Sequence, residues 1–184
     1  MPLKTTVLVT NITSLSDARY CAGMGVDFLA FPSHLISPQS FKDISGWVQG
    51  PKMVLDISDS AEIPDNLNDY PADLLLISRD QLNTISSRSE LPLIVGLQDH
   101  ASADLTRGSI EYVIVKTPFD IAEIKKFKHK ILINMQPGDL TLIDQWLSLP
   151  IAGLVLQGSQ ETKPGLKDYD NLSLALGSLE ASED

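Results

Sequence analysis

Four residues at or beside the ends of apolar segments have side chains suited to acid–base or nucleophilic chemistry. A histidine titrates near neutrality, and a carboxylate can act as a base. A lysine can bind phosphate or, when desolvated, form a Schiff base. A threonine hydroxyl is a poor base at neutral pH unless a partner activates it. The four candidates for catalytic chemistry are Thr10, His34, Asp56 and Lys116.

The same residue types also suit plain structural roles. His34 fits an exposed loop, as does the other histidine near a segment end, His100. Asp56 fits a helix cap or an ion pair with Lys52 or Arg79. A lysine at a strand end is commonly just solvated. The sequence therefore leaves both interpretations open for these side chains.

A second group of residues could hold an anion through the backbone. Amide N–H groups in a glycine-containing turn, followed by a helix N-terminus, form a common phosphate site. An ordinary strand-to-helix connection has the same composition, so the pattern is compatible with both. The candidate ligand-binding positions are Asn134, Gln136, Gly138, Gln157, Gly158 and Ser159.

Eight short apolar segments must position these residues. They are mostly continuous in apolar character and not alternating, which is typical of parallel strands buried on both faces. The predicted strands cover residues 5–11, 27–32, 52–58, 72–78, 91–97, 110–116, 130–135 and 151–157.

Helix signals lie between the predicted strands. Ser14 and Asp17 form a capping-box pattern, and Ser37-Pro38 resembles an N-cap followed by a first-turn proline. Later apolar stripes are Ile121/Ile124/Phe127, Leu140/Ile143/Leu147 and Leu172/Ala175/Leu179, the last with Asp168 as its expected cap. Residues 61–70, 80–88 and 99–108 give weaker signals.

Eight strand–helix units predict a compact (β/α)₈ barrel, with residues 1–184 as one domain. The 184 residues give 184/8 = 23 per unit, so the loops must be short. In this fold chemistry occurs at the carboxyl ends of the strands, and phosphate usually binds after strands seven and eight. A doubly wound sheet is the rival fold. No glycine-rich nucleotide-binding motif follows the first strand.

The composition excludes several classes of function. A net charge of −10 argues against a nucleic-acid or anionic-membrane surface. No apolar run is long enough to span a membrane, and the N-terminus lacks the apolar core of a signal peptide. With one cysteine and no cluster at metal-ligand spacing, we expect a cytoplasmic protein without a metal or cofactor.

The two ends of the chain resemble phosphoribosylanthranilate isomerase, a (β/α)₈ enzyme of tryptophan biosynthesis. That family opens with K-I-C-G-I-T and then E-D-A, and this chain has LVTNIT followed by SLSDA at residues 8–18. The family's second helix opens I-S-P, as at residues 36–38. Near the C-terminus the family has E, then P-G-x-K-D, which match Glu161, Pro164, Gly165, Lys167 and Asp168.

The departures from the family pattern lie at its functional positions. The resemblance places Thr10 at the family's general base, a cysteine, and Lys116 at its general acid, an aspartate. His34 or Leu35 stands where an arginine binds the anthranilate carboxylate. The glycine-rich loop after strand six is missing. Residues 134–136 stand where the family has a phosphate-binding Gly-Gly after strand seven, and they contain no glycine. Residues 157–159 stand where it has Ser-Ser-Gly after strand eight.

Four hypotheses follow. The first is a diverged relative that lacks normal isomerase activity and binds a small phosphorylated or anionic ligand. The second is an active isomerase with His34 or Asp56 as base and Lys116 as acid. The third is a lyase that uses Lys116 as a Schiff-base lysine. The fourth is an interaction protein that presents Trp47 or Trp146 on an outer helix. The sequence leaves the ligand and the oligomeric state undetermined.

Overall fold

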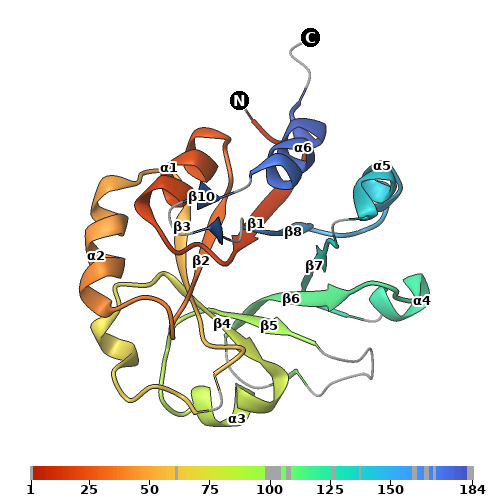
Figure 1. The fold of residues 1–184 in the computed structure, drawn as a ribbon. Helices are drawn as coiled ribbons and strands as arrows, with labels where there is room; N and C mark the ends of the chain where they lie inside the picture. Colours follow the sequence, from red (N-terminus) through yellow and green to blue (C-terminus); the bar gives the residue numbers. More distant parts are fainter. Residues whose placement is uncertain are drawn as a thin grey trace.

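The strands form a closed barrel in chain order, with every neighbouring pair parallel (Figure 1). The computed structural model describes residues 2–60, 62–97, 105–106, 109–125, 127–136, 138–158, 161–163, 166–167 and 169–181. This topology confirms the predicted (β/α)₈ fold, and the doubly wound alternative is wrong. The barrel strands are β1 (Thr6–Thr10), β2 (Phe28–Pro32), β3 (Lys52–Asp56), β4 (Leu74–Ser78), β5 (Leu93–Gly96), β6 (Ile110–Lys116), β7 (Lys130–Asn134) and β8 (Gly153–Gln157).

Each strand is apolar on both faces because each face meets a different core. Leu8, Val54 and Val155 belong to a cluster that fills the barrel interior. Their chain neighbours, such as Val7 and Leu55, belong to a second cluster between the barrel and the surrounding helices. Alternation along a strand sends successive side chains to opposite faces. The continuous apolar segments of the sequence are the result.

The helical layer around the barrel is uneven. The three helices of nine or ten residues in the described part of the chain are α1 (Leu15–Gly23), α2 (Pro38–Trp47) and α6 (Asp170–Leu179), which lie along the left and top of the barrel in Figure 1. The others are short: η1 (Leu67–Asp69), η2 (Arg79–Gln81), α3 (Leu82–Ile85), α4 (Ile121–Ile124), η3 (Asp139–Leu142) and α5 (Ile143–Leu147). In the described part of the chain, no helix has the length and apolar character that crossing a membrane requires.

The predicted helix starts at Ser14 and Ser37 are confirmed. Ser14 accepts a hydrogen bond from the Asp17 N–H, and Asp17 bonds back to the Ser14 N–H at 3.1 Å. Ser37 accepts from the Ser40 N–H at 3.1 Å, with Pro38 at the first helical position. These bonds satisfy amide groups that have no partner inside the helix.

Three expectations for the outer layer are wrong. Ile121 is exposed, because α4 makes a single turn and only Ile124 faces the core. The N-cap of α6 is Tyr169, where Asp168 was expected. Asp168 itself lies outside the described residues, as does most of the weak helix signal at 99–108. Trp146 is buried beside Phe119, so of the two tryptophans only Trp47, 76% exposed, is available at a surface.

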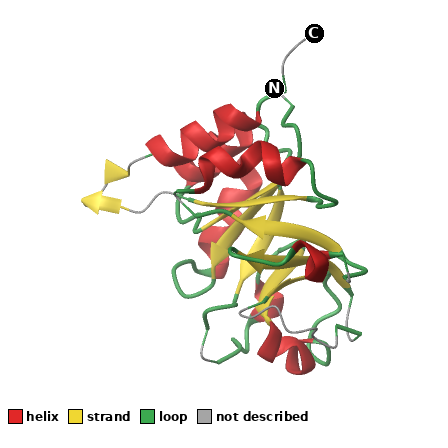
Figure 2. Cartoon of the chain, turned by 90° about the vertical axis from the view of Figure 1, so that its right-hand side faces the viewer, coloured by secondary structure: helices red, strands yellow, loops and turns green. Residues whose placement is uncertain are grey.

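A two-stranded antiparallel hairpin follows the barrel. Its strands are β9 (Glu161–Lys163) and β10 (Leu166–Lys167), and they project away from the helices in Figure 2. This hairpin occupies the family-like stretch before α6. Two of the residues that carry the resemblance, Glu161 and Lys167, pair across it.

A buried carboxylate joins the first helix to the last connection. Asp17 is only 3% exposed and accepts hydrogen bonds from the backbone of Thr13 and Ser14. The Tyr169 hydroxyl donates to its other oxygen at 2.6 Å, and the Tyr169 ring packs on Tyr20. Burial raises the pKa of Tyr169, and the bond to Asp17 raises it further.

Replacing Tyr169 with Phe tests this junction. Loss of a hydrogen bond to a buried charge should cost about 1–3 kcal/mol of unfolding free energy. A raised folded-state pKa means that the stabilisation is complete below the ordinary tyrosine value, about 10, and is lost as pH rises through the higher folded-state value. Chemical denaturation should therefore show a decline at alkaline pH that is weaker in Tyr169→Phe. Tyr20→Phe, which leaves the Asp17 bond in place, is the control and should keep the decline.

Gly153 provides a test of barrel closure. It pairs with Thr6 where β8 meets β1, and a Cβ there would overlap the Thr6 carbonyl oxygen. Gly153→Ala should cost at least about 2 kcal/mol, because backbone on both strands must move. Gly177→Ala is the matched control: its Cβ meets nothing within 4 Å on the exposed face of α6, so stability should rise by about 0.5–1 kcal/mol. Equal urea midpoints for the two variants would contradict this account of closure.

Candidate functional site at the carboxyl ends of the strands

A ring of mostly polar residues lies above the apolar interior of the barrel. Each member is two positions beyond an inward-facing core residue, so it projects toward the barrel axis like that residue. Thr10 follows Leu8, for example, and Asp56 follows Val54. Register pairs Thr10 with Gln157, and Lys116 with Asn134. The eight members are Thr10, Pro32, Asp56, Ser78, Gly96, Lys116, Asn134 and Gln157.

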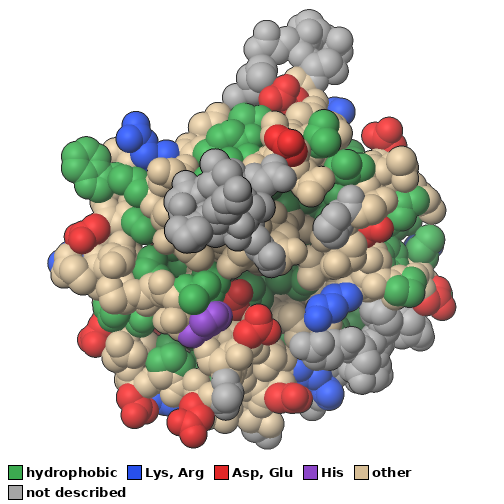
Figure 3. All heavy atoms as spheres, viewed as in Figure 1, with side chains coloured by type: hydrophobic (Ala, Val, Ile, Leu, Met, Phe, Trp, Pro, Cys, Tyr) green, Lys and Arg blue, Asp and Glu red, His purple; other side chains and the backbone are tan. Residues whose placement is uncertain are grey.

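Two adjoining hollows open within this ring, and together we call them the strand-end cleft. One, of about 170 Å³, is lined by polar residues Thr10, Asp56, Ser58, Asp59, Ser78, Lys116 and Asn134 over Leu76, Ile114 and Val155. The other, of about 240 Å³, is lined by Thr10, Asn11, Pro32, His34, Asp56, Asp59 and Gln157. Figure 3 shows a histidine with acidic side chains beside a hollow near the centre of the molecule. All four candidates for catalytic chemistry thus line one cleft.

Asp56 is the candidate whose environment changes its chemistry most. Its Oδ1 accepts from the Ser58 N–H at 2.9 Å and from the Ser58 hydroxyl at 2.6 Å. Burial raises the pKa of the Asp56 carboxyl above its ordinary value of 3.8, against the lowering effect of these two bonds. The nearby Asp59 charge raises the pKa as well, and His34 lowers it. A carboxyl with a raised pKa in a cleft is suited to exchanging protons.

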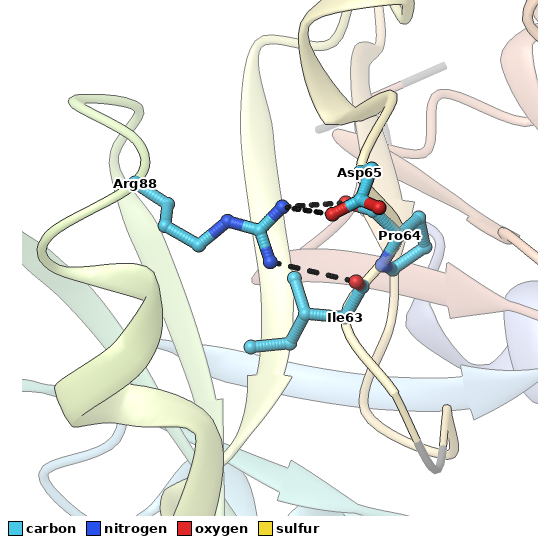
Figure 4. Close-up of polar contacts among 4 residues, drawn as sticks. All are labelled: Ile63, Pro64, Asp65 and Arg88. Carbon is cyan, nitrogen blue, oxygen red and sulfur yellow. Dashed lines mark hydrogen bonds and ion pairs between the residues drawn. The ribbon is translucent and has the colours of Figure 1, made fainter.

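The contact of Asp56 with Ser58 also has a structural side. A carboxylate that accepts from the N–H two residues on forms a local turn, so it terminates β3 much as a helix cap would. The ion pair recorded among the described residues joins Arg88 to Asp65 at 3.0 Å and involves neither Lys52 nor Arg79 (Figure 4). The turn role therefore has direct support and the expected ion pair has none.

Thr10 and Asn11 are shaped by the seam between β1 and β8. The Thr10 hydroxyl donates to the Leu156 carbonyl at 3.3 Å, and the Thr10 carbonyl accepts from the Gly158 N–H at 2.8 Å. Asn11 has a φ of +58°, a conformation that asparagine tolerates better than most residues. A Cβ on Gly158 would lie 2.6 Å from the Thr10 carbonyl oxygen. These two polar residues therefore have structural roles at the end of β1.

The loop after β7 is closed by Asp139, a residue that the sequence analysis missed. Its Oδ2 accepts from the Gln136 N–H at 2.8 Å and from the Thr117 hydroxyl at 3.3 Å. The backbone amide of one expected anion-binding position is thus already bonded to a carboxylate. The available signal was an aspartate three residues beyond Gln136, at the start of a helical turn, which is a common capping arrangement.

The remaining anion-binding candidates are dispersed. Gly138 is exposed, Gly158 is buried against β1, and Ser159 lies outside the described residues. Gln136 and Gln157 border a small and mostly apolar hollow of about 50 Å³ beneath α6, with Met135, Leu156 and Leu172. Asp59, which lines both hollows of the cleft, is a second residue that the sequence analysis did not select.

Several solved structures with this fold are phosphoribosylanthranilate isomerases. A phosphoribosylanthranilate isomerase from Thermus thermophilus has a TM-score of 0.70 at 17% identity, covering 95% of this chain and 98% of its own. TrpF from Jonesia denitrificans has 0.71 at 14%, covering 95% and 96%. An isomerase in complex with reduced 1-(o-carboxyphenylamino)-1-deoxyribulose 5-phosphate has 0.69 at 18%, covering 95% and 98%. No protein-family model and no curated protein matches the chain.

These likenesses span both chains almost entirely, so the chain has the barrel fold of the phosphoribosylanthranilate isomerases. The resemblance seen at the two ends of the sequence is confirmed at the level of fold. At these identities, fold is all that the likeness shows.

Asp56→Asn tests the electrostatics of the cleft. Because burial raises the folded-state pKa of Asp56, ionisation weakens folding: stability is highest below the ordinary value of 3.8 and falls as pH rises through the folded-state value. Asparagine keeps the acceptor for Ser58 without the charge. We expect Asp56→Asn to raise the midpoint of thermal unfolding at neutral pH, with a difference that disappears near pH 3.8. Asp80→Asn, at an exposed carboxylate, should have little effect at either pH. A lower midpoint for Asp56→Asn at neutral pH would refute the assignment.

Proposed function

We propose that this chain, with the fold of the phosphoribosylanthranilate isomerases, is a diverged relative that binds a small polar ligand in the strand-end cleft. It does not catalyse the parent isomerisation at a normal enzymatic rate. The proposal includes a single barrel domain over residues 1–184 and a cytoplasmic location, in keeping with a single, buried cysteine.

The hydrogen bond of Thr10 carries this proposal. An aldose–ketose isomerisation needs a base and an acid, each worth about 10²–10⁴-fold in rate. The resemblance places the base at Thr10, whose hydroxyl donates its proton to the Leu156 carbonyl. A hydroxyl held in that way, with a carbonyl as partner, is not activated for proton abstraction. The acid position carries Lys116, which lines the same hollow.

The sequence and the structure favour different charges for the ligand. The sequence pattern favours a phosphorylated or anionic ligand at the ends of β7 and β8. That expectation depends in part on the backbone amides of Gln136 and Gly158. The Gln136 amide already donates to Asp139, and the Gly158 amide already donates to the Thr10 carbonyl. The cleft itself remains the best supported location for a ligand, because it is the concave polar surface at the end of the barrel where this fold binds its ligands.

One observation favours a second candidate function, an active isomerase with substituted residues. Asp56 combines a raised pKa with a place in the cleft, and Lys116 lines the same hollow. A carboxylate base and an ammonium group across one cavity could share the roles of base and acid. Schiff-base chemistry at Lys116 stays a prediction, for which borohydride trapping with a carbonyl substrate is the test.

Turnover of phosphoribosylanthranilate separates the two candidates. For the diverged relative, kcat/KM should lie below about 10³ M⁻¹s⁻¹, under the range usual for enzymes. Asp56→Asn and Asp80→Asn should then be indistinguishable from the unchanged protein. Turnover at an ordinary rate would overturn the proposal. If Asp56→Asn alone then reduced the rate by about 10²-fold or more, as expected for loss of a base, the second candidate would be correct.

A further inference from the structure

We infer that the strand-end cleft selects a small hydroxylated amine and excludes phosphorylated ligands, and that Asp139 is the residue that keeps phosphate away from the end of β7. This inference rests on the proposed ligand-binding role of the cleft and specifies the chemical class of its ligand.

Acidic side chains outnumber basic ones over the cleft and the groove that adjoins it, among the described lining residues. Asp56 and Asp59 line both hollows. Glu62 and Asp59 border the open groove that continues from the cleft past His34. Lys116 and His34 are the basic side chains among the described lining residues. Low-dielectric walls focus such charges, so the potential in the cleft favours a cation. The net charge of −10 for the whole chain acts in the same direction.

Two backbone amides that could offset this potential are already bonded. At the end of β7, the Gln136 N–H donates to the Asp139 carboxylate, as does the Thr117 hydroxyl. A phosphate at this amide would have to displace a negatively charged side chain or lie against it, and like charges at such distances repel strongly. At the end of β8, the Gly158 N–H is bonded to the Thr10 carbonyl. The protein thus supplies its own anion where a ligand phosphate could have bound.

The other lining groups suit hydroxyls. Asn134 and Gln157 each present a donor and an acceptor, and the Ser78 hydroxyl can be either. Leu76 and Ile114 provide an apolar floor for the carbon chain of a polyol. A ligand with an ammonium group near Asp56 and Asp59, and hydroxyls near the amides, matches the carboxylates and the neutral polar groups of this lining.

Three probes that differ in one group test the inference: glucamine, sorbitol and sorbitol 6-phosphate. Isothermal titration calorimetry at neutral pH and low ionic strength should show glucamine binding at least about tenfold tighter than sorbitol, the ratio expected for one charge-assisted hydrogen bond. Sorbitol 6-phosphate should not bind. Added salt should weaken the binding of glucamine more than that of sorbitol. Binding of sorbitol 6-phosphate as tight as that of glucamine, or no binding of glucamine, overturns the inference.

Two pairs of variants test which residues make the cleft prefer an amine to a phosphate. Asp59→Asn should weaken glucamine binding about tenfold, and Asp80→Asn should not. Asp139→Ala frees the Gln136 amide, so it should gain measurable binding of sorbitol 6-phosphate. Asp144→Ala is the matched control, because it removes one charge from an exposed position on α5 and should gain none. Equal behaviour of these two alanine variants would refute the role of Asp139.

The experiments distinguish a failure of this inference from a failure of the proposed function. Isomerase turnover at an ordinary rate would overturn the proposed function. Tight binding of sorbitol 6-phosphate without isomerase turnover would leave the ligand-binding role standing and overturn only the class of ligand. The probe measurements on the unchanged protein need no variant, so they remain decisive if Asp139→Ala fails to fold.

Discussion

The structure depends on how closely β8 approaches β1. Gly153 and Gly158 lie at the two ends of this seam, and a side chain at either would meet the backbone of β1. Five residue pairs in register join the two strands, from Thr6–Gly153 to Thr10–Gln157. Closure at this seam turns eight parallel strands into a cylinder without a free edge. Only then does every second residue face one interior, so the polar ring and its cleft follow from closure.

The sequence predicted the barrel well because the physics behind it is local. Continuous apolar segments require two buried faces, and the caps at Ser14 and Ser37 depend on residues three positions away. The outer layer was harder to predict. Ile121 has the right residue type for burial, yet a single helical turn leaves it exposed, whereas Trp146, a candidate for a surface position, is buried. Whether an apolar residue is covered depends on neighbours that are distant in the sequence.

The candidate site was only partly predictable for the same reason. The residues that end the strands could be selected from spacing, and they do surround one cleft. What each of them can do depends on partners. The role of Thr10 depends on a carbonyl on β8, and the character of Asp56 depends on burial and on Asp59. Asp139 was missed because an aspartate next to a glycine suggests a turn, whereas its contact with Thr117 appears only in three dimensions.

The junction of Asp17 with Tyr169 has a consequence for the newly made chain. The two residues are 152 positions apart, so they can meet only after the chain as far as Tyr169 has left the ribosome. Until then the carboxylate on α1 lacks its phenol partner, and β1 lacks β8 beside it. Domains usually begin to fold from the N-terminal end during synthesis. β1 and α1 are thus made before β8 and Tyr169 but gain their full set of contacts only after both have followed.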